Sequence, residues 1–389
     1  MQVDYDLHGI VGVRLLDAGP GDVAAVSRQL GPIQSPLDRE PEITIRFVDR
    51  VAPRGQLRYL GLDEAGFTDD AFYVLRSKHK TGVKVRIPFG DVGGRCEFVC
   101  ERGVPAVPFL VATINLTALA RGALPLHASA FNYNGIGAVV TGWSKGGKTE
   151  TLLGFMNQGA EYIGDEWVYI SGDGRRVSGI PEPIRLWDWH LHELPRFRAL
   201  VGRRKRVRLR VLKGIRSACT LAPSSLFERI GQLLQRQLHV DIAPESLFGS
   251  GADTFSGNFD RLFFVASHDS PEIVVEPIDP NEVARRMSFS LTYERRDFMA
   301  LYRMFRFAFP EANNKLIEQA DGMQYELLLR VLASKPAYAV YHPYPVSIPA
   351  LVDAIEPLVV GDVSRHRNQT EVPARALVAS AQHERVAAI

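Results

Sequence analysis

A glycine-rich segment at 142–149 carries the residue types that bind a triphosphate. It reads GWSKGGKT and fits the pattern G-x-x-x-x-G-K-[ST]. In such a loop the glycines let backbone N–H groups approach the phosphates, Lys148 supplies charge at the β- and γ-phosphates, and the hydroxyl of Thr149 meets Mg²⁺. The sequence therefore predicts a nucleotide-binding loop made of Gly142, Trp143, Ser144, Lys145, Gly146, Gly147, Lys148 and Thr149.

The residues on either side of this loop predict a strand before it and a helix after it. Residues 138–141 (AVVT) are apolar and β-branched, as a buried strand requires. Residues 149–158 place three apolar side chains on one side and are followed by Gly159, a typical helix stop. The amino end of that helix would add its partial positive charge to the site. The alternative, a glycine turn before an ordinary helix, does not account for this order.

Four ionisable side chains lie at defined distances from the loop. His127 precedes Gly142 by fifteen residues, and Glu150 directly follows the loop. Asp165 and Glu166 end a second predicted strand. Because an acid at the carboxyl end of a neighbouring strand can hold Mg²⁺ beside a bound nucleotide, we expect ATP and Mg²⁺ as cofactors.

This arrangement resembles the HPr kinase/phosphorylase family, a group of P-loop proteins related in fold to phosphoenolpyruvate carboxykinase. The likeness covers about forty residues and contains no insertion. The matching positions are His127, the run 135–142 (GIGAVVTG), the run 147–150 (GKTE), Gly159, and the pair Asp165 and Glu166.

The resemblance implies a role for each matching side chain. Lys148 and the loop amides would hold the β- and γ-phosphates, and Thr149 would ligate Mg²⁺. Asp165 would be the base for the acceptor hydroxyl. Glu166 stands where the family usually has a second aspartate and would position metal or water. His127 would contact the transferring phosphoryl group, since such transfer depends mostly on positioning and electrostatics.

Simpler interpretations remain open for several of these residues. Glu150 would orient a metal-bound water, or it is only an acid that is favourable near a helix amino end. His127 is alternatively a histidine packed on a strand, and Asp165 a surface acid at a strand end. Trp143 and Lys145 stand where the family commonly has small or acidic residues. The Trp143 ring would stack on the nucleotide base or merely cover the loop.

A basic segment at 196–216 contains ten Lys or Arg residues and no acid. Its alternating stretch 205–211 predicts a strand with Arg206, Arg208 and Arg210 on one face and Val207, Leu209 and Val211 on the other. Such a strand would bind a phosphorylated or acidic substrate or clamp a phosphate. Equally, it would be a charged edge that discourages pairing. Nucleic acid is unlikely as a partner, because neither a known module nor interleaved aromatics are present.

Histidine and cysteine spacings give weak metal signals. The segment 187–192 (WDWHLH) is suited to an acceptor or base pocket, or to a core. His190 and His192 would share a strand face, yet the sequence offers no third ligand. Cys96 and Cys100 lack a second pair, which favours two half-buried strand thiols.

Composition is that of an ordinary globular protein: 389 residues, 46% hydrophobic, 23% charged, with a formal net charge of +2. This balance gives no global attraction to nucleic acid or membrane, and three cysteines are too few for a disulfide framework. The first residues do not form a basic region followed by an apolar one, and no apolar run reaches membrane-spanning length. We therefore expect a cytoplasmic protein.

The predicted fold class is α/β, or α+β overall, with a mixed-sheet nucleotide-binding core. We expect a β-rich section at 1–110, the core at 111–280, a helical section at 281–360 and a disordered tail at 361–389. Predicted strands lie at 43–48, 71–75, 83–87, 96–99, 261–266, 273–277 and 338–341. Predicted helices lie at 107–121, 280–288, 294–309, 312–332 and 348–355, with Tyr302, Phe305, Phe307 and Phe309 in the core.

Together these features predict an Mg·ATP-dependent kinase that phosphorylates a hydroxyl on a protein, peptide or small molecule. Residues 181–186 stand near the segment with which the family engages HPr but do not match it, so the acceptor is left open. Two other classes also remain open: a nucleotide-binding regulatory or assembly module without transfer, and an anion-binding protein acting through 196–216. The choice between ATP and GTP, and whether the chain forms a homo-oligomer, are not decided by the sequence.

Overall fold

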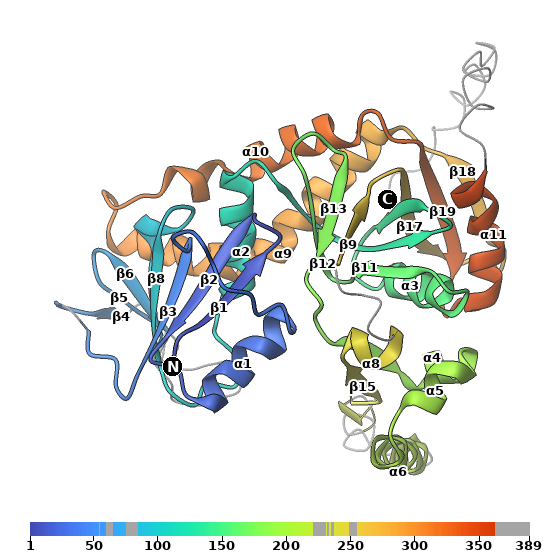
Figure 1. Cartoon of the computed structure of the whole chain (residues 1–389), viewed down its shortest axis with the longest axis horizontal. Coiled ribbons are helices and arrows are strands. Elements are labelled where there is room, and N and C mark those ends of the chain that lie inside the picture. Colours follow the sequence, from blue (N-terminus) through green and yellow to red (C-terminus); the bar gives the residue numbers. More distant parts are fainter. Residues whose placement is uncertain are drawn as a thin grey trace, which may run out of the picture.

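The computed structural model describes residues 1–53, 55–59, 65–74, 85–220, 231, 233–234, 237–248 and 255–361. Two mixed sheets lie side by side, with helices between and around them (Figure 1). The chain is therefore a mixed α/β protein, as the sequence predicts at that level. The expected tail at 361–389 falls, apart from Gly361, outside the described residues.

The first sheet is built from the amino-terminal hundred residues. Its strand order is β1-β2-β3-β8-β7-β6-β5-β4, and only the β2–β3 and β3–β8 pairs are parallel. The strands are β1 (Val3–Leu7), β2 (Val11–Leu16), β3 (Ile43–Val48), β4 (Arg58–Tyr59), β5 (Ala65–Phe67), β6 (Ala71–Val74), β7 (Val85–Pro88) and β8 (Cys96–Glu101). Helix α1 (Pro20–Leu30) and a 3-10 turn (Phe89–Asp91) complete this region. Residue 75 and residues 83–84 of two predicted strands lie outside the described residues.

The second sheet carries the predicted nucleotide loop. Its strand order is β16-β13-β12-β9-β10-β17-β19-β18, and β11 also pairs with β9. The strands are β9 (Leu124–Tyr133), β10 (Ile136–Thr141), β11 (Glu161–Gly164), β12 (Trp167–Ile170), β13 (Arg176–Gly179), β16 (Ser256–Asn258), β17 (Arg261–His268), β18 (Val274–Pro277) and β19 (Ala337–Pro343). Strand β19 pairs with both β17 and β18, so the section expected to be helical from 281 onward also contributes a strand to the core sheet.

The long strand β9 organises the centre of this sheet. One of its edges pairs with β10, and its other edge pairs first with β12 and then with β11. The chain therefore breaks its pairing with β9 between Gly164 and Trp167. Asp165 and Glu166 occupy this break, beyond the end of β11, whereas the sequence placed them at the end of the strand itself.

Five helices outside the first sheet cover the second or join the two: α2 (Leu110–Ala120), α3 (Lys148–Asn157), α9 (Pro280–Ala308), α10 (Lys315–Leu332) and α11 (Ile348–Val360). Helix α9 is continuous, although the sequence predicted two helices at 280–288 and 294–309. Its buried residues recur every three or four positions through the expected break, so one stripe packs along the whole length. Tyr302 and Phe305 are buried in this stripe as expected, and Phe309 is half-buried, but Phe307 is 78% exposed.

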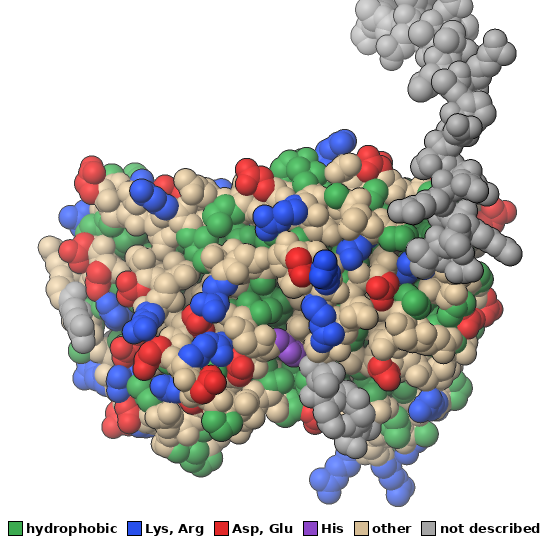
Figure 2. Space-filling view, turned by 45° about the horizontal axis from the view of Figure 1, so that its top comes forward, with side chains coloured by type: hydrophobic (Ala, Val, Ile, Leu, Met, Phe, Trp, Pro, Cys, Tyr) green, Lys and Arg blue, Asp and Glu red, His purple; other side chains and the backbone are tan. Residues whose placement is uncertain are grey.

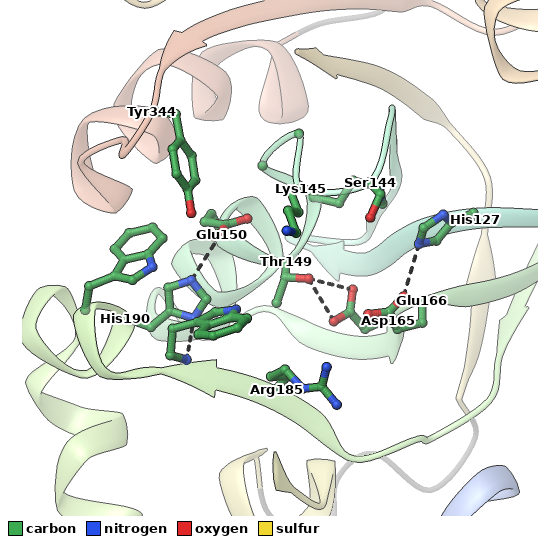
Figure 3. Close-up of a pocket in the computed structure, with 15 residues that line it drawn as sticks. His127, Ser144, Lys145, Thr149, Glu150, Asp165, Glu166, Arg185, His190 and Tyr344 are labelled. Carbon is green, nitrogen blue, oxygen red and sulfur yellow. Dashed lines mark hydrogen bonds and ion pairs between the residues drawn. The ribbon is translucent and has the colours of Figure 1, made fainter. Parts of the chain in front are cut away.

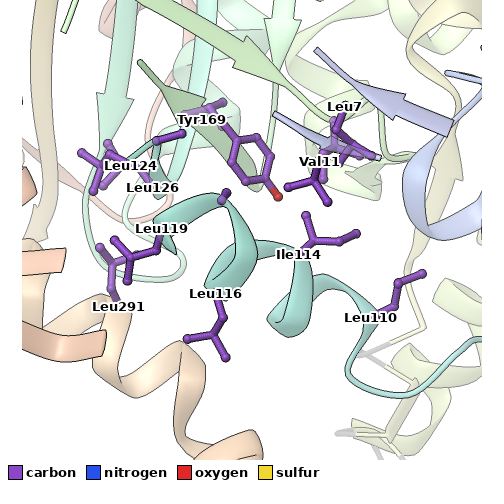
Figure 4. Close-up of a cluster of buried hydrophobic side chains, with 14 of the residues drawn as sticks. Leu7, Val11, Leu110, Ile114, Leu116, Leu119, Leu124, Leu126, Tyr169 and Leu291 are labelled. Atoms are coloured by element: carbon purple, nitrogen blue, oxygen red, sulfur yellow. The ribbon is translucent and has the colours of Figure 1, made fainter. Parts of the chain in front are cut away.

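A single apolar core runs from the first sheet to the second through α2 (Figure 4). Leu7 and Val11 of the first sheet pack toward one side of this helix, and Leu124 and Leu126 of β9 lie on its other side. A second core, under α3 and α11, occupies the opposite face of the second sheet. The loop 142–149 therefore stands on a sheet that is packed on both faces.

Residues 180–255 form an insertion between two strands that pair with each other, β13 and β16. Its elements are β14 (Ile184–Trp187), α4 (Asp188–Glu193), α5 (Pro195–Leu200), α6 (Arg203–Thr220), β15 (His239–Ile242) and α8 (Pro244–Phe248). The strand predicted at 205–211 is wrong, because these residues lie in α6. Leu209 is buried there while Val207 and Val211 are about half exposed, so burial follows the helical period.

The face drawn in Figure 2 shows no dominance of one charge. Basic and acidic side chains intermingle across the face drawn in Figure 2, in keeping with a net charge of +2. Within the described ranges, no helix combines the length and apolar character needed to span a bilayer.

Candidate functional site

The loop 142–149 joins β10 to α3 and depends on its glycines. Gly142 and Gly147 have φ angles of 157° and 105°, which favour glycine. A Cβ at Gly142 would lie 2.2 Å from the carbonyl oxygen of Val265, and one at Gly147 would lie 2.3 Å from Nε2 of His342. The backbone of this loop can therefore keep its path only with glycine at both positions.

His342, on β19, supports the loop from below. Its side chain is fully buried, and Nε2 lies 2.8 Å from the carbonyl oxygen of Gly146, to which it donates. This contact fixes the direction of the Gly146 carbonyl and ties the loop to β19. No local pattern in the sequence points to this residue, which lies almost two hundred positions after the loop.

Lys148 is buried beneath the loop. Its Nζ donates hydrogen bonds to the carbonyl oxygens of Gly142 and Trp143, at 3.3 and 3.0 Å. Burial lowers the pKa of this amine, and nearby carboxylates, Glu166 and Asp165 foremost, oppose that shift. A cation that is buried to this degree interacts strongly with an anion that enters the site, because solvent screens its charge little.

Asp165, the first residue of the acidic pair, is buried. Oγ1 of Thr149 donates to its Oδ2 at 3.0 Å, and the hydroxyl of Ser129, on β9, donates to its Oδ1. Burial, with the charge of Glu166 as the second cause, raises the pKa of Asp165 to about 6. This carboxyl can therefore exchange a proton near neutral pH.

His127 links the acidic pair to α9. Its Nε2 lies 3.0 Å from Oε2 of Glu166, and its Nδ1 faces Oε1 of Glu294 at 3.3 Å. Burial alone would lower the pKa of His127, but the two carboxylates outweigh it and the pKa is raised. The hydrogen bond from His127 in turn lowers the pKa of Glu166. The imidazole ring also stacks on Trp167, with centroids 5.7 Å apart.

A second histidine–carboxylate contact lies on the other side of Thr149. The N–H of Trp187 donates to Nδ1 of His190, so Nε2 carries the proton that is donated to Oε1 of Glu150 at 3.1 Å. Both side chains are nearly inaccessible to solvent. Burial would raise the pKa of Glu150, but the hydrogen bond from His190 prevails and lowers it.

The proposed pairing of His190 with His192 on one strand face is wrong. Both belong to helix α4, where residues two apart point in different directions, and His192 is 54% exposed. Among the described residues, no group of three or more His, Cys, Asp or Glu side chains is arranged as a metal cluster. Cys96 and Cys100 are buried thiols of β8, and burial raises the pKa of both, that of Cys100 to about 12. The side chain of Cys219 lies outside the described residues.

These groups surround one pocket of about 530 Å³. In Figure 3 the acidic pair and His127 lie at one end, Glu150, His190 and Tyr344 lie at the other, and Thr149 is between them. The lining consists of His127, Ser144, Lys145, Gly146, Gly147, Lys148, Thr149, Glu150, Asp165, Glu166, Arg185, Trp187, Trp189, His190 and Tyr344. We call the two ends the carboxylate end (His127, Asp165, Glu166) and the aromatic end (Trp187, Trp189, His190, Tyr344).

The structure brings together nearly all the residues singled out in the sequence. Lys148, Thr149, Asp165, Glu166 and the others reach the same pocket from β9, the loop, α3 and the β11–β12 break. Gly142 and Trp143 are the exceptions and do not line the pocket; the side chain of Trp143 is 49% exposed and packs on Tyr293 of α9. Sequence reasoning missed Ser129, Arg185, Glu294, His342 and Tyr344.

The chemistry of the donors suits a magnesium ion at Thr149 and Asp165. Mg²⁺ commonly takes one or two protein oxygens and completes its shell with phosphate and water. The hydroxyl of Thr149 and the carboxylate of Asp165 are already adjacent. Glu150 and Glu166, also expected as metal ligands, are each hydrogen-bonded to a histidine and would act on metal-bound water rather than on the ion.

Comparisons with models of protein families and with curated proteins found no match to this chain.

Proposed function

We propose that this protein is an Mg·ATP-dependent phosphotransferase of the HPr kinase-like type, which transfers the γ-phosphate to a hydroxyl group. The observation that carries the proposal is the contact between Thr149 and Asp165. This contact joins a hydroxyl at the start of α3 to a buried carboxyl whose pKa is about 6. Both groups line a pocket that also contains the glycine-rich loop and the buried Lys148.

The loop and Lys148 would bind the phosphates. The amino end of α3 begins at Lys148, so its free N–H groups and partial positive charge face the pocket. Lys148 would exchange its contacts with two loop carbonyls for contacts with phosphate oxygens. Thr149 and Asp165 would hold Mg²⁺, which when bound neutralises negative charge on the phosphates.

Asp165 would accept the proton of the attacking hydroxyl. Without a metal ion the pKa of Asp165 is raised to about 6, and Mg²⁺ on the same carboxyl would lower that pKa and keep the group charged as a proton acceptor. His127, held between Glu166 and Glu294, would direct positive charge at the phosphoryl group as it transfers. Arg185, on the opposite wall, is a further cation within the pocket.

The direct test is transfer of labelled phosphate. Wild type and Lys148→Ala would be incubated with γ-labelled ATP, Mg²⁺ and a cell extract, with the exposed Lys315→Ala as control. We expect label on an acceptor with wild type and Lys315→Ala only. Binding of nucleotide without transfer to any acceptor would favour a regulatory or assembly module. Calorimetry that detects binding of neither Mg·ATP nor Mg·GTP to folded protein would refute nucleotide chemistry altogether.

A further inference from the structure

The aromatic end of the pocket differs from the carboxylate end in what it offers a ligand. Its one ionisable side chain that faces a carboxylate is already engaged, because His190 is hydrogen-bonded to Glu150. What remains are ring surfaces. Trp189 and Tyr344 meet at 85° with centroids 6.4 Å apart, and Tyr344 is 60% exposed. Two rings at this angle form a corner in the pocket wall, in which Trp189 is half-buried and also contacts His190 at 4.2 Å, while Tyr344 is the more exposed ring.

The position of this corner relative to the loop fixes which part of a nucleotide can reach it. A triphosphate that ends at Lys148 and Asp165 leaves the loop at the start of α3, past Thr149. The next residue is Glu150, which contacts His190 at the aromatic end. The ribose and base would thus lie beside Trp189 and Tyr344. A pocket of about 530 Å³ falls within the range that binds small molecules.

We propose that the aromatic corner formed by Trp189 and Tyr344 binds the base of the nucleotide by stacking. The proposal rests on the phosphotransferase function above and adds to it the residues that bind the base of the nucleotide. Stacking on aromatic rings favours the larger purine surface and needs no specific hydrogen bonds. Trp189 belongs to the insertion 180–255, and Tyr344 follows β19 of the sheet. A bound base therefore bridges the insertion and the core.

Trp143 is the competing candidate for a base contact. Its ring belongs to the loop itself, but it packs on Tyr293, at 5.1 Å, outside the residues that line the pocket. A base on Trp143 would also require the nucleotide to run in the opposite direction, with its γ-phosphate away from Asp165. The two arrangements predict different sensitive residues, so they can be separated.

The test compares ATP with inorganic triphosphate, which has the same phosphate chain and no base. Calorimetry in Mg²⁺ would measure both affinities for wild type, Tyr344→Ala, Trp189→Ala and Trp189→Phe. The control is Phe307→Ala, which removes an exposed ring of α9 outside the pocket. We expect ATP affinity to fall about tenfold in Tyr344→Ala and Trp189→Ala, and less in Trp189→Phe, which keeps a ring. Triphosphate affinity should stay constant throughout.

The outcomes separate this inference from the function on which it rests. Equal ATP affinity in wild type and Tyr344→Ala overturns the stacking site while leaving phosphate binding intact. So does a loss of ATP affinity in Trp143→Ala alone. If wild type binds neither ATP nor triphosphate, the proposed function itself fails. Thermal unfolding would check each variant, and if Trp189→Ala does not fold, the exposed Tyr344 and the conservative Trp189→Phe still decide the question.

Discussion

The two ends of the pocket both contain a histidine beside a carboxylate, but they use it in different ways. At the aromatic end His190 and Glu150 form one buried pair, and the other ring nitrogen of His190 is satisfied by a backbone N–H. At the carboxylate end His127 lies between Glu166 and Glu294, and Asp165, which precedes Glu166 in the chain, receives hydrogen bonds from hydroxyl groups of Thr149 and Ser129.

This difference shifts the pKa values of Asp165 and Glu150 in opposite directions. Asp165 is buried beside a second negative charge, so its pKa is raised to about 6. Glu150 is buried as well, yet its histidine lowers its pKa. One buried carboxyl is thereby poised to exchange a proton, and the other is held charged. The comparison shows that, for two carboxyls with little exposure to solvent, the contact partner decides whether the pKa is raised or lowered.

The largest effect should come from removing the reactive carboxyl. Asp165→Asn is expected to reduce phosphate transfer by about 10²- to 10⁴-fold, the usual contribution of a general base. In wild type, kcat/KM should fall as the pH drops below about 6, because Asp165 takes up a proton there. Label transfer across pH 5 to 8 would measure both. Retention of full activity by Asp165→Asn would show that the ends do not differ as described, and the exposed Asp353→Asn is the matched control.

A smaller effect is expected when the hydrogen bond between Glu150 and His190 is weakened. Glu150→Gln should reduce the free energy of unfolding by about 2 kcal/mol at pH 7, because a buried, charge-assisted hydrogen bond to His190 is weakened. The folded-state pKa of Glu150 is lowered from 4.5, so its stabilisation is present above that value and is lost as the pH falls through the folded-state pKa. Urea unfolding at pH 7 and pH 3.5 would measure this. A difference from wild type that stays constant with pH would contradict the assignment.

The smallest expected effect is a gain in the free energy of unfolding rather than a loss. Asp165→Asn should increase the free energy of unfolding at pH 7 by about 1 kcal/mol, because the raised pKa means that the charged form is disfavoured in the fold. The destabilisation by Asp165 develops as the pH rises from 3.8 to about 6, so below 3.8 the gain should vanish. The gain is partial because asparagine also loses the attraction to Lys148. A variant less stable than wild type at pH 7 would argue against an unfavourable charge at 165.

Local sequence patterns predicted one side of the pocket well. The loop, β10, α3 and the acidic pair form a continuous stretch whose residues are neighbours in the chain. By contrast, Ser129 of β9 and Glu294 of α9 contact the pocket residues Asp165 and His127, and Tyr344 enters the pocket from the chain after β19. None of the three belongs to a recognisable local motif. Their contribution depends on how the sheet is ordered, which periodicity in a single sequence does not specify.

The misplaced strand at 205–211 has a definite physical origin. Alternating Arg and apolar residues match the period of a strand, but Arg, Lys and Leu are also strong helix formers. In α6 the apolar side chains of Val207 and Val211 stay largely exposed, and only Leu209 is buried among them. Packing of one face against the core therefore decided for a helix, although the alternation predicts a strand. In α9 a continuous buried stripe likewise joins the two helices that the sequence predicts.

The direct pairing of β13 with β16 has an evolutionary consequence. The two strands hold each other whatever chain connects them, so the connection can lengthen, shorten or exchange sequence while the sheet keeps its register. Where residues of this connection contact a ligand, the ligand preference can change between related proteins. The residues of the loop 142–149 and the pair Asp165 and Glu166 need not change with it.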